Sequence, residues 1–247
     1  MRLAVRRVVF GVAGAGLLAV LVTGFSGLPA FGEHVVSAGE HTSRVEPGQR
    51  RATNVVTSIV VDYRGFDTLG EESILFAAAT GVALLLRPSR RERRLRPERE
   101  PPPAVDDVIG FVGRAIAGPI ALLGLSLIAN GSLTPGGGFQ GGAIVASAGI
   151  AVMLMIGHRP FERLAPTSAL DVLEGFGIAG YAFLGVAGLV VGLSFLENML
   201  PLGRFGSLLS TGFMPLINLC IGVAVAGGLL LVVAEFLEQT LHGGGTE

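Results

Sequence analysis

The stretch SLTPGGGFQGGAI, Ser132 to Ile144, places one proline and five glycines directly between two long apolar runs. Glycine is costly inside helices and strands because its backbone loses the most freedom on folding. So many glycines in so short a segment indicate close backbone contact, an unusual backbone conformation or a helix break. The apolar runs on either side decide between these.

The composition is too apolar for an ordinary soluble domain. Of the 247 residues, 50% are hydrophobic and 15% are charged, and the mean hydropathy is +0.65. The aromatic content is only 6%, while glycine occurs 38 times, which is typical of membrane helices packed closely through small residues. The composition therefore predicts a membrane subunit embedded among other helices.

Four apolar runs approach the roughly 20 residues that a helix needs to cross a bilayer, and two further runs are shorter. The four long runs are Val8 to Phe25, Val108 to Ala129, Val172 to Leu196 and Gly212 to Ala234. Two shorter runs, Ser73 to Leu86 and Ala143 to Ile156, span only if their N-terminal flanks, Asp67 to Glu72 and Gly137 to Gly142, also lie partly at membrane depth. The sequence thus predicts an all-α, polytopic membrane protein with about six transmembrane helices.

Arginine placement predicts the orientation, because basic residues are retained on the cytoplasmic side of membrane helices. All 18 basic residues are arginine. They gather before the first helix (Arg2, Arg6, Arg7), after the second (Arg87, Arg90, Arg91, Arg93, Arg94, Arg96, Arg99) and after the fourth (Arg159, Arg163). Both termini are therefore expected in the cytoplasm. The alternative is a cleaved N-terminal signal peptide, which would leave five helices, but the first apolar run is longer than the usual 7 to 15 residues.

The segment RPSRRERRLRPEREPPPAV marks a break in composition. It predicts a two-helix unit over residues 1–87, an arginine-rich cytoplasmic linker over 88–105 and a four-helix unit over 106–247. A solvated linker explains these charges better than nucleic-acid binding, because aromatic residues and a folded context are missing.

Several kinds of chemistry are excluded or argued against. The chain has no lysine, so it can hold neither a Walker-type phosphate loop nor a Schiff base. Its lone cysteine, Cys220, allows no internal disulfide, and its four histidines are too scattered for a metal site. A GxGxxG pattern within the glycine segment lacks the preceding strand of a dinucleotide site. We therefore expect no enzymatic activity, cofactor or metal.

The glycine segment itself is expected within the outer leaflet, because ~20 residues before Arg159 lies Phe139. Irregular backbone at that depth must be covered by protein or by a wet cavity. Pro135 ends the third helix, the glycines let the chain reverse, and Gln140 is expected to satisfy freed backbone groups. We favour a packing role over direct ion contact; the helix-break and packing residues are Pro135, Gly136, Gly137, Gly138, Gly141 and Gly142.

The stretch VVDYRGFDTLGEES, Val60 to Ser73, concentrates charge at the start of an apolar helix. Ionisable groups beside hydrocarbon usually pair, or line a path for protons or cations. The ion-path candidates are Asp62, Arg64, Asp67 and Glu71, together with Glu174 in the fifth helix. For Glu71 the alternative is a capping box with Thr68; for Glu174 it is a structural pair with Arg114.

Two motifs carry a family resemblance. The segment NVVTSIVVDYRGFDTLGEESILFAAATGVALLL resembles the C-terminal portion of the large subunit of Mrp (Mnh) sodium/proton antiporters and the corresponding small subunit of membrane-bound hydrogenases. The segments LTPGGGFQGGAIVASAGIAVML and FMPLINLCIGVAVAGGLLLV resemble the MnhB (MrpB) subunit. Together they cover most of residues 54–236, here joined on one chain.

The resemblance implies a membrane subunit that exchanges sodium for protons under the proton-motive force, in the cell membrane and among other antiporter subunits. It also implies that Arg64 and Glu71 occupy charged family positions. The family often has histidine at the position of Ser132 and a charge at that of Ala224, which argues against a conduit through those two sites here. Alternatives are an ion-translocating subunit of a hydrogenase-type or other respiratory complex, and a purely structural scaffold.

The topology can be tested by cysteine labelling. In a Cys220→Ser background, Ser43→Cys should react with an impermeant thiol reagent added outside intact cells. Ser89→Cys should react only after the membrane is opened, because the arginine clusters place it in the cytoplasm. The reverse pattern would refute the orientation.

Overall fold

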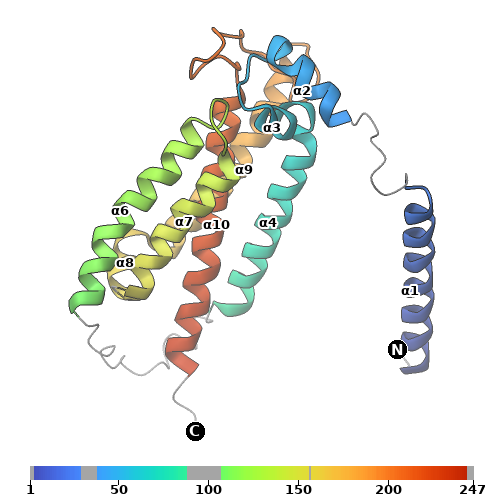
Figure 1. Cartoon of the computed structure of the whole chain (residues 1–247). Helices are drawn as coiled ribbons and strands as arrows, with labels where there is room; N and C mark the ends of the chain where they lie inside the picture. Colours follow the sequence, from blue (N-terminus) through green and yellow to red (C-terminus); the bar gives the residue numbers. More distant parts are fainter. Residues whose placement is uncertain (1–2, 29–37, 88–106, 156, 244–247) are drawn as a thin grey trace. The chain divides into compact units, whose positions relative to one another are not determined.

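The computed structural model describes residues 3–28, 38–87, 107–155 and 157–243 (Figure 1). The chain divides into two units, residues 1–41 and 42–247, which we describe separately. The first unit holds α1 (Leu3–Ser26), whose described side chains from Arg7 onward are exposed within the chain. A helix that is apolar on every side suits a membrane environment.

The second unit contains five helices long and apolar enough to cross a membrane. These are α4 (Gly65–Leu86), α6 (Asp107–Ala129), α7 (Gly138–Met155), α9 (Thr167–Val190) and α10 (Met214–Gly243). Shorter elements are α2 (Ala38–Gln49), α3 (Val55–Ser58), the π-helical turn η1 (Ile59–Tyr63) and α8 (His158–Leu164). With α1 there are six candidate spans and no strand among the described residues, which confirms the predicted all-α membrane fold.

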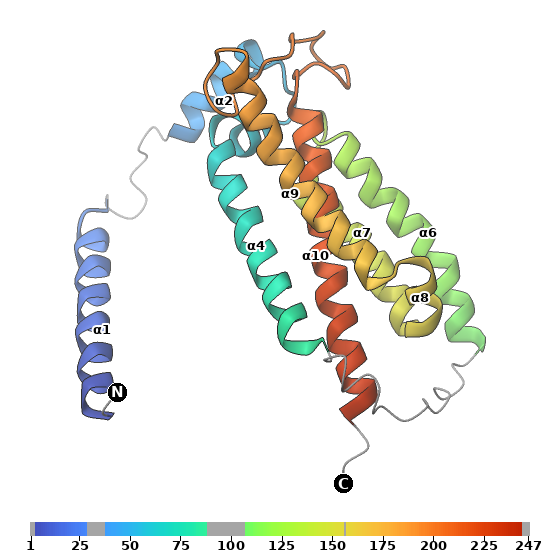
Figure 2. The ribbon, with the colours of Figure 1, turned by 180° about the vertical axis from the view of Figure 1, so that it is seen from behind.

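Helix α10 is the centre of the second unit. It packs against α4, α6, α7 and α9 (Figures 1 and 2). More than half of its span, 56%, is buried, against 17% to 33% for the other spans of this unit. Its buried residues Met214, Ile217 and Ile221 form one apolar cluster with Tyr181 of α9, and Leu231 forms another with Leu170. Helices α4, α7 and α9 are therefore positioned by their contacts with α10, whereas α6 packs mainly on α7.

The helix boundaries include the flanks of both short apolar runs. Helix α4 begins at Gly65 and α7 at Gly138, so each gains the length it needs to span. Helix α9 ends at Val190, earlier than the apolar run, because the chain turns at Gly192 with a φ of +84°. The linker 88–105 lies outside the described residues; the division at Arg87 and the cytoplasmic termini stay predictions.

A network of hydrogen bonds joins the start of the first family motif, at Thr53 and Asn54, to the loop before the glycines. The amide nitrogens of Thr53 and Asn54 donate to the carbonyl oxygen of Ser132 at 3.2 and 3.1 Å. The Asn54 side-chain nitrogen donates to the carbonyl oxygens of Gly131 at 2.7 Å and Thr134 at 2.8 Å. The two motifs singled out in the sequence are therefore neighbours in the fold.

Candidate functional site

Four of the five predicted ion-path residues lie at the start of α4, with different surroundings. The Asp62 carboxylate pairs with Arg50 at 2.7 Å, and its side chain is only 4% exposed. Burial raises the pKa of Asp62, while the Arg50 charge opposes that shift. Arg64 and Asp67 form a 2.6 Å ion pair on the exposed surface, and Glu71 is exposed within this chain.

The expected capping box between Thr68 and Glu71 is wrong. Helix α4 begins at Gly65, four residues earlier than the box requires, because η1 leads almost directly into it. The amide of Thr68 already donates to the Arg64 carbonyl oxygen at 3.4 Å. The Thr68 hydroxyl instead donates to the carbonyl oxygen of Val60 at 2.7 Å, which ties α4 to η1. Glu71 is left without the capping role.

The acid that α4 buries is Glu72, the neighbour of the predicted candidate. Its side chain is 1% exposed, and its Oε1 atom has no hydrogen-bond partner. Thr68, Glu72, Ala79 and Ala83 are buried along α4. Their spacing of four, seven and four residues defines one helical face, so the sequence did contain the signal that points to Glu72.

Glu174, the fifth predicted residue, is buried on α9 against α10. It is 2% exposed and its Oε1 atom also lacks a hydrogen-bond partner. A Cβ atom placed on Gly228 would lie 2.6 Å from this oxygen, so the glycine makes room for the carboxyl group. The expected pair with Arg114 is not formed: Arg114 is exposed on α6, which packs on α7 and α10.

A second charged cluster, not predicted from the sequence, lies at the C-terminal end of α4 and joins it to α9 and α10. The guanidinium of Arg87 pairs with Asp171 of α9 at 2.8 Å and with Glu235 of α10 at 2.5 Å. The hydrogen bond to Asp171 is the main cause that raises the pKa of Arg87 still further, so this arginine is permanently charged. In the sequence Arg87 is the first of a run of arginines, and nothing in that run distinguishes it as the partner of Asp171 and Glu235.

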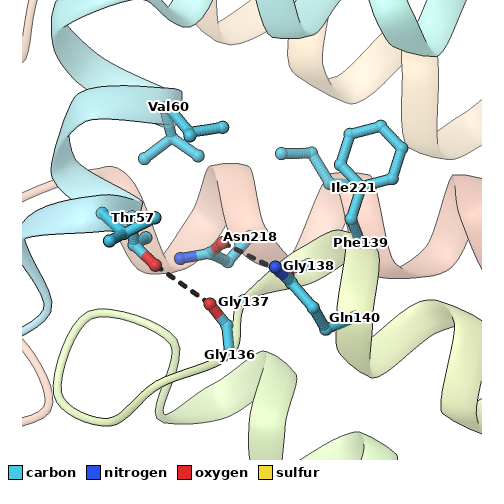
Figure 3. Close-up of a pocket in the computed structure, with 11 residues that line it drawn as sticks. Thr57, Val60, Gly136, Gly137, Gly138, Phe139, Gln140, Asn218 and Ile221 are labelled. Carbon is cyan, nitrogen blue, oxygen red and sulfur yellow. Dashed lines mark hydrogen bonds between the residues drawn. The ribbon is translucent and has the colours of Figure 1, made fainter. Parts of the chain in front are cut away.

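The glycine segment packs against α10 and α6 (Figure 3). Gly136 and Gly137 both have a φ of +142°, which side chains rarely adopt. Helix α7 then begins at Gly138, whose amide donates to Asn218 Oδ1 of α10 at 3.0 Å. Asn218 therefore takes the role expected of Gln140, which is exposed, because α10 passes directly beside the break.

A small cavity lies beside this break, between η1 and α10. Its volume is about 60 Å³, and Thr57, Gly137 and Asn218 are among its lining residues (Figure 3). Thr57 donates to the Gly136 carbonyl oxygen at 3.1 Å, while the Asn218 side-chain nitrogen is buried without a partner. The space exceeds the ~15 Å³ that one water needs, so the cavity can hold water that satisfies this nitrogen.

Two family models match successive parts of the chain. A domain related to the MnhB subunit of Na+/H+ antiporters matches residues 108–231. The chain belongs to the MnhB-related family. Residues 39–102 match a second model, that of the MbhE subunit of MBH. This MnhB-related chain therefore carries both segments, as the two sequence motifs predicted.

Two proteins are similar in sequence to the MnhB-related chain. An uncharacterised protein of Methanocaldococcus jannaschii is 30% identical over 197 residues, covering 71% of this chain and 74% of the relative. A Rhizobium meliloti protein, named as a probable K(+)/H(+) antiporter subunit of type A/B, is 29% identical over 217 residues, covering 77% of this chain but 21% of the relative. The MnhB-related chain thus corresponds to only a part of that second, much longer protein.

Two solved structures share the fold. A chain of the membrane-bound sulfane sulfur reductase, an archaeal respiratory membrane complex, has a TM-score of 0.68 and 34% identity; the match covers 94% of this chain and 98% of that chain. A chain of the Mrp complex of a Dietzia species has a TM-score of 0.68 and 22% identity, covering 98% of this chain and 26% of that chain. Both structures are multisubunit membrane complexes.

The close packing of the glycine segment can be tested by adding bulk. Gly138→Leu should strongly reduce assembly, because even a Cβ atom there would lie 2.5 Å from the Asn218 carbonyl oxygen and Ile221 Cβ. Gln140→Ala, at an exposed position, should assemble normally, as should Gly118→Leu on α6, where nothing lies within 4 Å. Native gel analysis of detergent-solubilised membranes measures this. Wild-type assembly of Gly138→Leu would show that the segment is loosely packed.

Proposed function

We propose that this chain is a membrane subunit of a multisubunit cation/proton antiporter driven by the proton-motive force. The observation that carries the proposal is the burial of Glu72 and Glu174, neither of which pairs with a cation from the described residues, inside a bundle of membrane-spanning helices. Acids in such places commonly serve ion or proton movement. The MnhB-related match and the antiporter relative support the same function.

The exchange itself belongs to the assembled complex. The chain spans about a fifth of the Rhizobium relative and about a quarter of the matched Mrp chain. It therefore supplies one part of a larger complex. Its contribution is membrane-spanning helices and charged side chains rather than catalysis of a covalent reaction. Its partners are other membrane subunits, the lipid bilayer, and the sodium ions and protons that the complex exchanges.

The exposed charges of α4 belong to a cation path that a neighbouring subunit completes. Asp67 and Glu71 lie within the candidate span Gly65–Leu86, yet both are exposed in this chain. A carboxylate facing hydrocarbon is costly, so this face of α4 requires a protein cover. Arg64 holds Asp67, and Asp62 with Arg50 lies just before the helix. Together with the covering subunit they provide oxygen ligands for sodium.

A second candidate function is an ion-translocating subunit of a respiratory complex. The observation that favours it is the match to the membrane-bound sulfane sulfur reductase, at 34% identity over nearly the whole of both chains. In that case electron transfer in other subunits would drive ion movement. The membrane bundle would perform the same task in either complex.

Transport in everted vesicles tests the proposed function. The complete complex, expressed in a host without its own sodium/proton antiporters, should release a respiration-generated proton gradient on addition of sodium or potassium. A complex without this chain should not. Glu71→Gln should lower the rate several-fold with normal assembly, because it removes a cation-attracting charge. Glu162→Gln, at an exposed position on α8, is the control.

Two outcomes would contradict the antiporter assignment. One is cation-dependent proton movement that persists at the wild-type rate without this chain. The other is co-purification of the tagged chain with iron–sulfur subunits, seen by their visible absorbance and by mass spectrometry, together with proton movement that requires an electron donor. The second outcome would establish the respiratory alternative.

A further inference from the structure

Five charged residues lie along the seam where α4, α9 and α10 meet. Glu72 of α4 and Glu174 of α9 are both buried in the region where these two helices pack on each other and on α10. Glu174 is in turn within reach of Asp171, one helical turn away. Asp171 pairs with Arg87, which also pairs with Glu235 of α10. The seam therefore holds a series of acids from the third turn of α4 to its C-terminal end.

The charges of this seam do not balance. Among the described residues, four acids share one arginine, so three negative charges have no described counter-charge when all four acids are ionised. Three of the acids, Glu72, Glu174 and Glu235, are at most 2% exposed. Several unpaired carboxylates cannot stay ionised in such surroundings without a large cost in free energy. Some of them must therefore be neutralised by protons or by a bound metal cation.

The surroundings of the two unpaired acids favour protons. Sodium and other hard cations need several oxygen ligands. The Glu174 carboxyl group faces Gly228, which offers no side-chain ligand. Beside Glu72, the hydroxyl groups of Thr68 and Tyr181 already donate to the carbonyl oxygens of Val60 and Gly65, at 2.7 Å each. Neither hydroxyl hydrogen is therefore available to stabilise an ionised Glu72 carboxylate, which favours its protonated form. Cys220 of α10 adds only a thiol.

Other titratable groups on the packed elements are few. Glu71 lies beside Glu72 on α4 but is exposed. Tyr181 on α9 and Cys220 on α10 are neutral side chains next to Glu72. Helix α7, which also packs on α10, has no ionisable residue in its sequence. Helix α10 carries one further acid, Glu238, one turn beyond Glu235. Within the part of the chain that the structure describes, the four acids of the seam and Arg87 are the charged groups joined by burial and ion pairing.

We propose that Glu72, Glu174 and the Arg87-bound pair of Asp171 and Glu235 form a proton relay within this chain. This proposal rests on the proposed function. The relay is the proton path of the antiporter subunit and is distinct from the cation path on the exposed face of α4. In each step the O–H bond of a protonated carboxyl group breaks and one forms on the next carboxylate, through hydrogen-bonded water. One proton moves and one negative charge moves the other way.

Gly228 is a positioning residue of this relay. Because a Cβ atom at this position would lie 2.6 Å from Glu174 Oε1, Gly228→Ala must displace the carboxyl group. The matched control is Gly175→Ala on α9, where nothing lies within 4 Å. Both changes add one methyl group to a membrane helix, but only the first reaches the relay.

The first experiment measures exchange in everted vesicles with the complete complex. Glu72→Gln and Glu174→Gln should each lower cation-dependent proton movement at least tenfold with assembly preserved. Glu174→Asp, which keeps a carboxyl group, should retain part of the activity, and Gly228→Ala should lower the rate more than Gly175→Ala. Glu162→Gln should match the wild type. Wild-type rates in both glutamine variants would overturn the relay, while loss of exchange without the chain would still support the proposed function.

The second experiment distinguishes a proton from a sodium ion. In purified wild-type complex at neutral pH, infrared spectra should show a protonated carboxyl band that shifts in D₂O and is reduced in Glu72→Gln or Glu174→Gln. Binding of ²²Na+ to the same complexes should be unchanged by either substitution. An unaltered band, or a several-fold loss of sodium affinity in these variants, would overturn the proton assignment. If a glutamine variant does not assemble, the exchange rates of Glu174→Asp and Gly228→Ala test the relay instead, because neither substitution removes the acid. Wild-type rates in both of these variants would overturn the relay.

Discussion

The close approach of α7 and α9 to α10 is the constraint on which the rest of the structure depends. Glycines lie at the contact points: a Cβ atom on Gly142 would be 2.7 Å from the Gly222 carbonyl oxygen, and one on Gly177 would be 2.6 Å from the Cys220 carbonyl oxygen. In a membrane, apolar surface alone does not drive helices together, so close packing of small residues must do so. The same closeness buries the Glu174 carboxyl group of α9 against Gly228 of α10.

The membrane fold was predictable because it depends on quantities that a sequence states directly. Apolar length predicts the spans, and the glycines around Pro135 predict a break followed by α7. The buried acids were harder to assign. Glu71 and Glu72 are adjacent and chemically identical, so only the direction of each around α4 separates them. The spacing of Thr68, Glu72, Ala79 and Ala83 carries that direction, but the capping-box interpretation singled out Glu71 instead, and η1 places the helix start at Gly65 rather than after Thr68.

Pairing between distant segments could not be predicted from composition. Arg87 appeared to belong to a run of arginines, yet it is held by acids from α9 and α10, 84 and 148 residues away. Glu174 was expected to find Arg114, but α6 packs on α7 and α10 and leaves that arginine exposed. Which charges meet is decided by the order in which helices surround α10, and no local pattern encodes that order.

The two matched segments are also joined by contacts at both ends of α4. At one end, Thr53 and Asn54 bond to Ser132; at the other, Arg87 is shared with Asp171 and Glu235. The peptide linker between the segments is therefore not what keeps them together. A chain cut by a protease within residues 88–106, or expressed as two separate polypeptides, should still associate into the same bundle. Fusion on one chain then guarantees equal numbers of the two segments, rather than creating the interface between them.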